Sequence, residues 1–378
     1  MNVYNNTKNN HGNIARNTVK LAPPSSLVCS TTSIFGSFFG STTMKGTDKA
    51  VKEPFDLSSA MATDLASELK VTDSNNIVQD GSNGERDTIG DFLIGPNKGG
   101  RVYNSWNIKT KRVNVIKLIK KSDITGPSAL AKINREASVM NHHGYHQNNI
   151  IAIREILHSP TYIAFVMEDG IMTLDQLMCN DEFRHQHDLA QQVTAGLVNA
   201  TRYLHSVGIA HGDIQTCNVV FRISKDTKRI LAEHVRLCNF GRACFAVERD
   251  PNSTKPMDLK DAKVYVSHAD LKTSTSFRAP ETCDDSHSFD LCGTDMWSIG
   301  LCLMRMVYEE EFSRVQAAIR CNNFAKVQRI VDGLKDGILG QLWERKMNHF
   351  MFATLEQDPK KRMVAKEAME HTWMFHDY

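Results

Sequence analysis

The sequence contains no long hydrophobic run: no stretch approaches the ~18 uncharged apolar residues that a membrane-spanning helix needs. Its first residues, MNVYNNTKNNHGN, also lack the basic-then-apolar order of a secretory signal. We therefore expect an intracellular protein, cytoplasmic or nuclear, with no membrane association.

An excess of charge of one sign is missing too. Lysine and arginine number 45 and aspartate and glutamate 43, which gives a formal net charge of +2. The overall charge therefore provides no electrostatic basis for dedicated binding of nucleic acid. The nine cysteines include no CxxC pair, which favours reduced thiols over a disulfide framework or a zinc site.

Most of the chain has the composition of a globular protein. With 378 residues, of which 41% are hydrophobic, it is long enough to bury a sizeable core. Residues 1–86 differ: they are rich in asparagine, serine, threonine and glycine and predict a disordered, low-complexity extension. Its SIFGSFF segment (33–39) is interpreted as incidental apolar residues, with a short docking peptide as the alternative, and residues 56–70 predict a weak helix.

Patterned sequence begins at Asp87. The segments DFLI, RVYNSW and VNVIKLI have strand composition, and the short polar connections between them predict three antiparallel strands. Pro127 then precedes SALAKINREASVM, whose apolar residues fall on one helical face. Residues 188–205 predict a core-facing helix, and residues 294–307 predict a buried helix capped by Thr294. A sheet followed by helices indicates an α+β fold.

Three features in this first half suit the handling of a phosphate. In IGPNKGGRVY, Gly95 and Gly100 let backbone amides approach a polyphosphate, although an ordinary hairpin fits the same string. Lys117 ends VNVIK, where its ammonium group can reach phosphates; the alternative is a surface lysine on an edge strand. Glu136, on the amphipathic helix, can pair with Lys117, although a lone helix glutamate is usually solvated.

The string HGDIQTCNVVF is more specific. It places His211, Asp213 and Asn218 in a turn between a helix and a β-like run. There an aspartate can accept a proton from an attacking hydroxyl, while an asparagine oxygen ligates magnesium. The string VRLCNFGRA follows after a hairpin and contributes Asn239.

With FRAPE ending at Glu281, DMWSIG around Asp295 and the late run DPKKRMVAKEAMEHTW, the chain resembles the eukaryotic protein-kinase family over residues 88–378. Small-molecule phosphotransferases of the aminoglycoside and choline kinase type share the HGDxxxxN loop but lack the first two of these elements. The resemblance implies a bilobal fold, with a small antiparallel β-sheet lobe carrying helix C at residues 87–169 and a larger, mainly helical lobe at 170–378.

The resemblance also implies roles for individual residues. Asp213 matches the catalytic base, and Lys117 resembles the lysine that contacts the α and β phosphates, with Glu136 as its partner. Asp295 looks like the brace of the catalytic loop, and Ser274 like a mark of Ser/Thr specificity. Asn218 and, weakly, Asn239 correspond to the metal ligands of the family. Glu281 and Arg362 correspond to its buried ion pair. The residues that correspond to its ATP-binding site are Ile94, Gly95, Gly100, Val102, Val115, Met167 as gatekeeper, Glu168, Gly170 and Val220.

Several departures weaken the resemblance to an active kinase. Asn239 replaces the aspartate of the DFG motif, and a neutral amide is a poorer ligand for a hard dication than a carboxylate. Gln215 replaces a lysine, Gly212 an arginine and Asn97 a glycine of the family pattern, and Val115 narrows the adenine slot.

These departures predict a Ser/Thr-kinase-like pseudokinase that regulates or scaffolds a partner protein. The alternative is an atypical active Ser/Thr kinase that transfers the γ-phosphate of ATP, with magnesium or manganese, to a protein substrate. Binding of partners through the N-terminal extension alone is a third hypothesis. The oligomeric state does not follow from the sequence.

Overall fold

The computed structural model describes eleven stretches, which all belong to the unit Thr43–Tyr378. They are residues 71–73, 88–147, 149–159, 161–168, 172–179, 187–221, 230–246, 264–266, 276–283, 289–336 and 342–375. The expected helix at 56–70, the SIFGSFF segment, Gly170 and Ser274 lie outside the described residues. Within these stretches, no helix is both long and apolar enough to span a bilayer.

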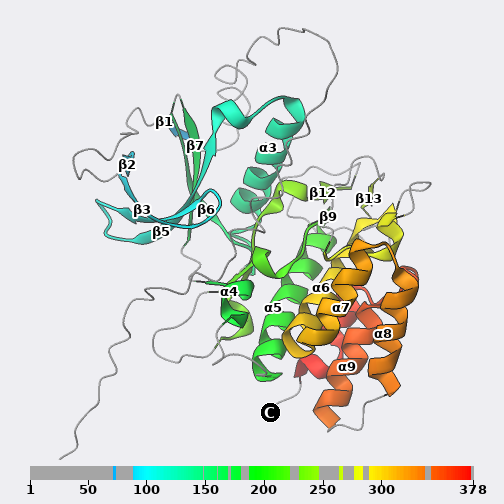
Figure 1. Ribbon diagram of the computed structural model, residues 1–378. Helices are drawn as coiled ribbons and strands as arrows, with labels where there is room; N and C mark the ends of the chain where they lie inside the picture. Colours follow the sequence, from blue (N-terminus) through cyan, green and yellow to red (C-terminus); the bar gives the residue numbers. More distant parts are fainter. Residues whose placement is uncertain are drawn as a thin grey trace, which may run out of the picture. The chain divides into compact units, whose positions relative to one another are not determined.

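A seven-stranded sheet, with the order β1-β6-β7-β5-β4-β3-β2, forms the first part of the fold (Figure 1). Its neighbouring strands pair antiparallel, except that β1 runs parallel to β6. The three strands predicted from DFLI, RVYNSW and VNVIKLI are confirmed as β3, β4 and β5. The strands are β1 (Val71–Asp73), β2 (Thr88–Ile89), β3 (Phe92–Gly99), β4 (Val102–Asn107), β5 (Val113–Lys120), β6 (Ile153–His158) and β7 (Tyr162–Glu168).

Strand β1 falls inside the segment predicted to be disordered, so that prediction does not hold for its three residues. Composition misses such a strand because the hydrogen bonds of a β-ladder come from the main chain, and a short polar segment can supply them.

Helix α3 (Pro127–His142) is the predicted amphipathic helix. It begins with Pro127 in its first turn, where the missing backbone N–H costs no hydrogen bond. Its buried residues are the four apolar residues expected from the pattern, together with Val139 and Glu136. The helix contacts β6 of the sheet and the short 3₁₀ helix η6 (Phe240–Arg242), so it joins the sheet to the NFG segment.

The second part of the fold is helical (Figure 1). Helices α5 and α6 pack on each other, α10 packs on α5, and α7 and α9 pack on α6. The predicted helices at 188–205 and 294–307 are confirmed as α5 and α6. The helices are α4 (Leu174–Met178), α5 (His187–Ser206), α6 (Leu291–Val307), α7 (Glu309–Arg320), α8 (Phe324–Asp336), α9 (Leu342–Thr354) and α10 (Ala365–Glu370).

The predicted start of α6 is wrong by one turn. The N-cap is Asp290, whose side chain accepts a hydrogen bond from the backbone N–H of Cys292. Thr294 lies inside the first turn, where its hydroxyl donates to the carbonyl of Leu291. Because an aspartate caps as well as a threonine, the earlier residue takes this position and lengthens the helix.

Short strands hold the loops between the helices. Strands β8 (Met172–Thr173), β10 (Val219–Phe221) and β11 (Val235–Leu237) form one sheet, and β9 (Ile209–Ala210) pairs with β12 (Cys244–Phe245). β13 (Tyr265–Val266) pairs with β14 (Phe289–Asp290). The loop that carries Asp213 therefore runs from β9 to β10, and the NFG segment from β11 to β12, so short ladders fix both ends of each.

Candidate active site

Lys117 and Glu136 form a close ion pair. The Nζ atom of Lys117 lies 2.6 Å from Oε1 and 2.8 Å from Oε2 of Glu136. The carboxylate is nearly buried, with 7% of the side chain exposed, while the lysine keeps 21% exposure. Because β5 lies between β4 and β7, the alternative of a surface lysine on an edge strand is wrong, and so is that of a solvated glutamate.

Three of the four apolar residues predicted to lie above and below adenine belong to one cluster, together with the predicted gatekeeper Met167. Val115 and Met167 are buried partners across β5 and β7, and Val102 and Val220 pack against the same core. Ile94 packs instead with a second apolar cluster that contains Ile116 and Val166. The structure therefore does not bring Ile94 together with the other four.

The physical reason for the position of Ile94 is the irregular pairing of β3 with β4. Ile94 lies opposite Ser105, and register shifts occur between Ile94 and Asn97 and between Asn97 and Gly99. A shift of one residue moves a side chain to the other face of the sheet. The resemblance, from which Ile94 was carried over as an adenine contact, does not account for these shifts.

The glycine-containing loop is a hairpin with tight backbone contacts. A Cβ on Gly95 would lie 3.2 Å from the carbonyl oxygen of Asn104, and Gly100 has a φ of +58°. The side chain of Asn97 donates from Nδ2 to the carbonyl of Gly100 at 2.9 Å. This asparagine therefore stabilises the turn from within, where the family has a glycine.

Glu168 ends β7, next to the predicted adenine contacts. Its Oε1 lies 3.0 Å from Nε of Arg236 on β11. The pair ties β7, an inner strand of the sheet, to the ladder that holds the loop of Asp213. The backbone of Gly170, the second predicted adenine contact here, is outside the described residues.

Asp213 lies at the centre of a hydrogen-bond network and is 9% exposed. Its Oδ1 accepts from Nε2 of Gln215 at 3.1 Å, and its carbonyl accepts from Nδ2 of Asn218 at 2.7 Å. Burial raises the pKa of the Asp213 carboxyl, and the positive charge of Arg242 and interactions with His211 oppose that rise. The raised pKa suits a group that exchanges a proton.

Asp295 braces the backbone that precedes Asp213. Its carboxylate accepts from the backbone N–H of His211 at 2.8 Å and of Gly212 at 2.9 Å, and it lies 3.0 Å from Nε2 of His205. This arrangement confirms the bracing contact expected from the resemblance. Gly212 has a φ of +72°, and a Cβ there would lie 2.8 Å from the carbonyl oxygen of Arg242.

Asn239 and Asn218 bind each other. Asn239 has left-handed backbone angles, with φ 68° and ψ 63°, and its Nδ2 donates to Oδ1 of Asn218 at 3.1 Å. The Nδ2 atom of Asn218 donates to the carbonyl of Asp213, so it is the Oδ1 atom of Asn218 that faces Asn239. The two predicted metal ligands thus form an uncharged, hydrogen-bonded pair.

This pair does not fit a magnesium ion. Magnesium requires hard oxygen ligands, usually including carboxylates, but the Oδ1 atom of Asn218 is engaged by an N–H group. Across the described residues, no group of three or more histidine, cysteine, aspartate or glutamate side chains is arranged to hold a metal.

Arg242 is a site residue that sequence reasoning missed. Its Nε lies 3.7 Å from Oδ2 of Asp213. Its Nη1 atom is buried and has no hydrogen-bond partner among the residues that the structure describes. One feature of the sequence could have indicated it: Arg242 is a cation three residues after Asn239, and Asn239 is the residue that replaces the family's carboxylate.

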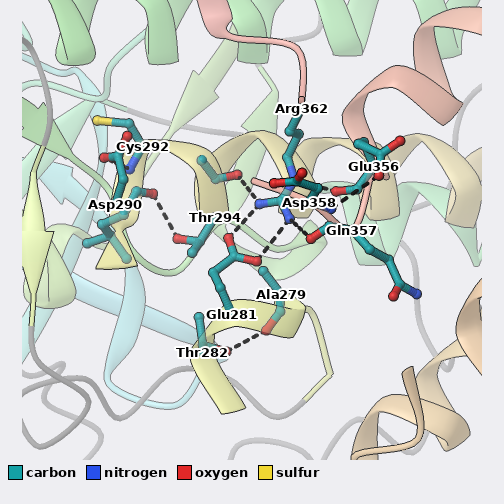
Figure 2. Close-up of polar contacts among 12 residues, drawn as sticks. Ala279, Glu281, Thr282, Asp290, Cys292, Thr294, Glu356, Gln357, Asp358 and Arg362 are labelled. Atoms are coloured by element: carbon teal, nitrogen blue, oxygen red, sulfur yellow. Dashed lines mark hydrogen bonds and ion pairs between the residues drawn. The ribbon is translucent and has the colours of Figure 1, made fainter. Parts of the chain in front are cut away.

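Glu281 and Arg362 form the buried ion pair expected from the resemblance (Figure 2). The Arg362 guanidinium donates to both carboxylate oxygens of Glu281, at 2.5 and 2.9 Å. It also donates to the carbonyls of Gly293 and Glu356, at 2.9 and 2.8 Å. Arg362 thereby joins η8 (Pro280–Cys283), the start of α6 and the loop before α10.

The two cysteines beside the site are poor nucleophiles. Burial raises the pKa of the Cys238 thiol to about 12, and it raises that of Cys217 further still. Neither forms a disulfide, nor does any other cysteine that the structure describes. Both thiols therefore fit the role of small hydrophobic side chains that fill space beside the site.

Comparisons with known proteins agree with this geometry. The family model described as Protein kinase domain matches residues 91–374. The chain is 24% identical over 293 residues to calcium-dependent protein kinase 7 of Arabidopsis thaliana, covering 74% of this chain and 47% of that protein. It is 23% identical over 287 residues to CDPK-related kinase 5 of the same plant, covering 75% and 41%.

A third relative, calcium-dependent protein kinase 16 of Oryza sativa subsp. japonica, is 23% identical over 296 residues, covering 75% of this chain and 47% of that protein. The chain thus spans less than half of the length of these curated relatives. Protein kinase domains in general use ATP with magnesium and act on protein substrates. The matched region contains nearly all of the sheet, the helical part and the loop of Asp213, so the chain belongs to the protein kinase domain family, with distant similarity to Ser/Thr kinases.

Proposed function

We propose that this protein is a pseudokinase, a Ser/Thr-kinase-like module that regulates or scaffolds a partner protein and transfers phosphate weakly or not at all. The observation that carries the proposal is the hydrogen bond from Nδ2 of Asn239 to Oδ1 of Asn218. This hydrogen bond joins the two candidate metal ligands to each other. Neither residue has the negative charge that holds magnesium between phosphates.

The expected loss of rate is large. Removing one strong electrostatic contact from a transition state costs roughly 3 to 4 kcal/mol, or about a hundred- to a thousandfold in rate. Gln215 adds to this loss, because it donates a hydrogen bond to Asp213 but brings no charge to a phosphoryl group. Both changes fall on the part of the mechanism that stabilises charge.

The alternative function, an atypical active Ser/Thr kinase, is favoured by the retained machinery. The Lys117–Glu136 pair is formed at 2.6 Å, and Asp213 is held by a network with a raised pKa. In that function Asp213 accepts the proton of a substrate hydroxyl, and the lysine holds the α and β phosphates of ATP.

Asn239→Asp in the full chain tests the two functions. Phosphate transfer from γ-labelled ATP, with magnesium and with manganese, is measured on a mixed peptide substrate and on the protein itself. For a pseudokinase that lacks only its metal ligand, we expect weak or undetectable transfer by the wild type and, in Asn239→Asp, a rate at least about a hundredfold above the wild-type rate or detection limit.

Asn322→Asp is the matched control, because Asn322 is also an asparagine with a positive φ, of 52°, and lies on an exposed turn after α7. It should leave transfer unchanged. Robust transfer by the wild type that is lost in Asp213→Ala would refute the pseudokinase and establish the active kinase.

A further inference from the structure

Arg242 places an unsatisfied charged donor beside the catalytic loop. Its Nε is 3.7 Å from Oδ2 of Asp213, and its side chain is 30% exposed. The buried Nη1 has no hydrogen-bond partner within the part of the chain that the structure describes. A buried donor without a partner is costly, and an anionic oxygen is the acceptor that best satisfies a guanidinium group.

The backbone is arranged to bring Arg242 close. A Cβ on residue 212 would lie 2.8 Å from the carbonyl oxygen of Arg242, so Gly212 permits this approach. Position 212, where the family has an arginine, is a glycine in this chain, and a different arginine, Arg242, lies beside Asp213. The missing side chain at position 212 leaves room for the backbone of Arg242.

The balance of charge points to the same role. Lys117 is paired with Glu136, and Arg242 with Asp213, so these four side chains carry no net charge. Without Arg242, the remaining three would carry one excess negative charge, which repels a polyphosphate. Gln215 and Asn239 supply hydrogen-bond donors to the same network without adding charge.

We propose that this site binds a nucleoside triphosphate in its metal-free form and that the Arg242 guanidinium supplies the positive charge for the terminal phosphates. The misfit between the two asparagines and a divalent cation is the basis of the metal-free form. The inference rests on the proposed function, a kinase-like module without strong phosphate transfer, and on the resemblance of Lys117 to the lysine that contacts the α and β phosphates.

Calorimetric titration of the full chain with ATP and with AMP, in EDTA and in magnesium, tests the proposal. Wild type should bind ATP in EDTA with a Kd within about threefold of that in magnesium. Arg242→Gln should weaken binding of ATP in EDTA about tenfold and leave AMP within about twofold, because AMP lacks the terminal phosphates. Arg242→Lys, which keeps the charge, should lose less than Arg242→Gln.

Arg320→Gln is the matched control, since Arg320 lies exposed on α7 and bonds only Gln316 among the described contacts; it should bind like the wild type. Melting midpoints without nucleotide show that each variant is folded. Binding of ATP only with magnesium, binding in neither buffer, or equal affinity of Arg242→Gln and wild type would each overturn the inference. The proposed function fails by a different result, metal-dependent phosphate transfer by the wild type.

Discussion

At the scale of single residues, Asp213 makes the stability of the fold depend on pH. Burial raises the pKa of its carboxyl above the ordinary value of 3.8, so the folded protein holds this proton more tightly than the unfolded chain does. The stabilisation from protonated Asp213 is therefore fully present below pH 3.8 and is lost as the pH rises through the raised pKa. Above the raised pKa, the buried carboxylate is less favourable to the fold than its protonated form is.

Asp213→Asn should consequently raise the free energy of unfolding at pH 7 by an amount on the order of 1 kcal/mol, and by less at pH 4. The variant removes the buried charge and keeps an oxygen that can accept from Gln215. Urea unfolding of both proteins at the two pH values measures the difference. Asp91→Asn is the control, because Asp91 is half-exposed beside Lys109 and should change the free energy by less than about 0.5 kcal/mol. A larger gain at pH 4 than at pH 7 would contradict the expected sign.

The same residue scale shows which parts of the site could be predicted. The Lys117–Glu136 pair followed from a strand and an amphipathic helix whose patterns were clear, and the structure confirms the contact. The contact between Arg242 and Asp213 did not follow, because it depends on the left-handed turn at Gly212 and on the reach of a long side chain. The packing of Ile94 against the second apolar cluster did not follow either, because the β3–β4 register shifts have no clear signal in the sequence.

At the scale of elements, Arg362 connects three segments that are distant in sequence (Figure 2). Its side chain is 1% exposed and that of Glu281 9%, so the pair has little access to water. The guanidinium also lies over the ring of Trp297, 5.2 Å from its centroid. Loss of one partner leaves a buried charge without compensation.

Arg362→Met should therefore lower the free energy of unfolding by about 3 to 5 kcal/mol. The double variant with Glu281→Gln should be less destabilised than Arg362→Met alone, because it no longer buries an unpaired carboxylate. Urea unfolding measures both. The control Arg101→Met removes an exposed ion pair with Asp123, and its free energy of unfolding should change by less than about 1 kcal/mol. Equal losses in the Arg362 and Arg101 variants would show that burial adds nothing to this contact.

Element boundaries were harder to predict than elements. The apolar stripe of α5 and the nearly all-apolar surface of α6 identified both helices, since burial in a large core requires such surfaces. The first residue of α6 was missed because both Asp290 and Thr294 are good capping residues, and the sequence contains no preference between them. The strand β1 was missed because main-chain pairing needs little from side chains.

At the scale of the whole molecule, one apolar cluster crosses from the sheet into the helices. Its buried members include Phe165 of β7, Met140 of α3, Phe240 of the NFG segment and Trp297 of α6. Helix α3 also contacts η6, which follows Asn239. A continuous core of this kind makes the unfolding of one part expose the apolar surface of the other.

We therefore expect the sheet and the helical part to unfold in one cooperative step. Hydrogen exchange followed by mass spectrometry in increasing urea should show the amides of β7 and α6 losing protection at the same denaturant concentration, because their slowest exchange would need the same global opening. Amides of the exposed turn at Asn322 should exchange early and serve as the internal control. Loss of protection in β7 at clearly lower urea than in α6 would mean that the sheet opens separately. The shared cluster would then be too weak to couple the binding of a nucleotide near Lys117 to the helical surfaces that a partner protein would contact.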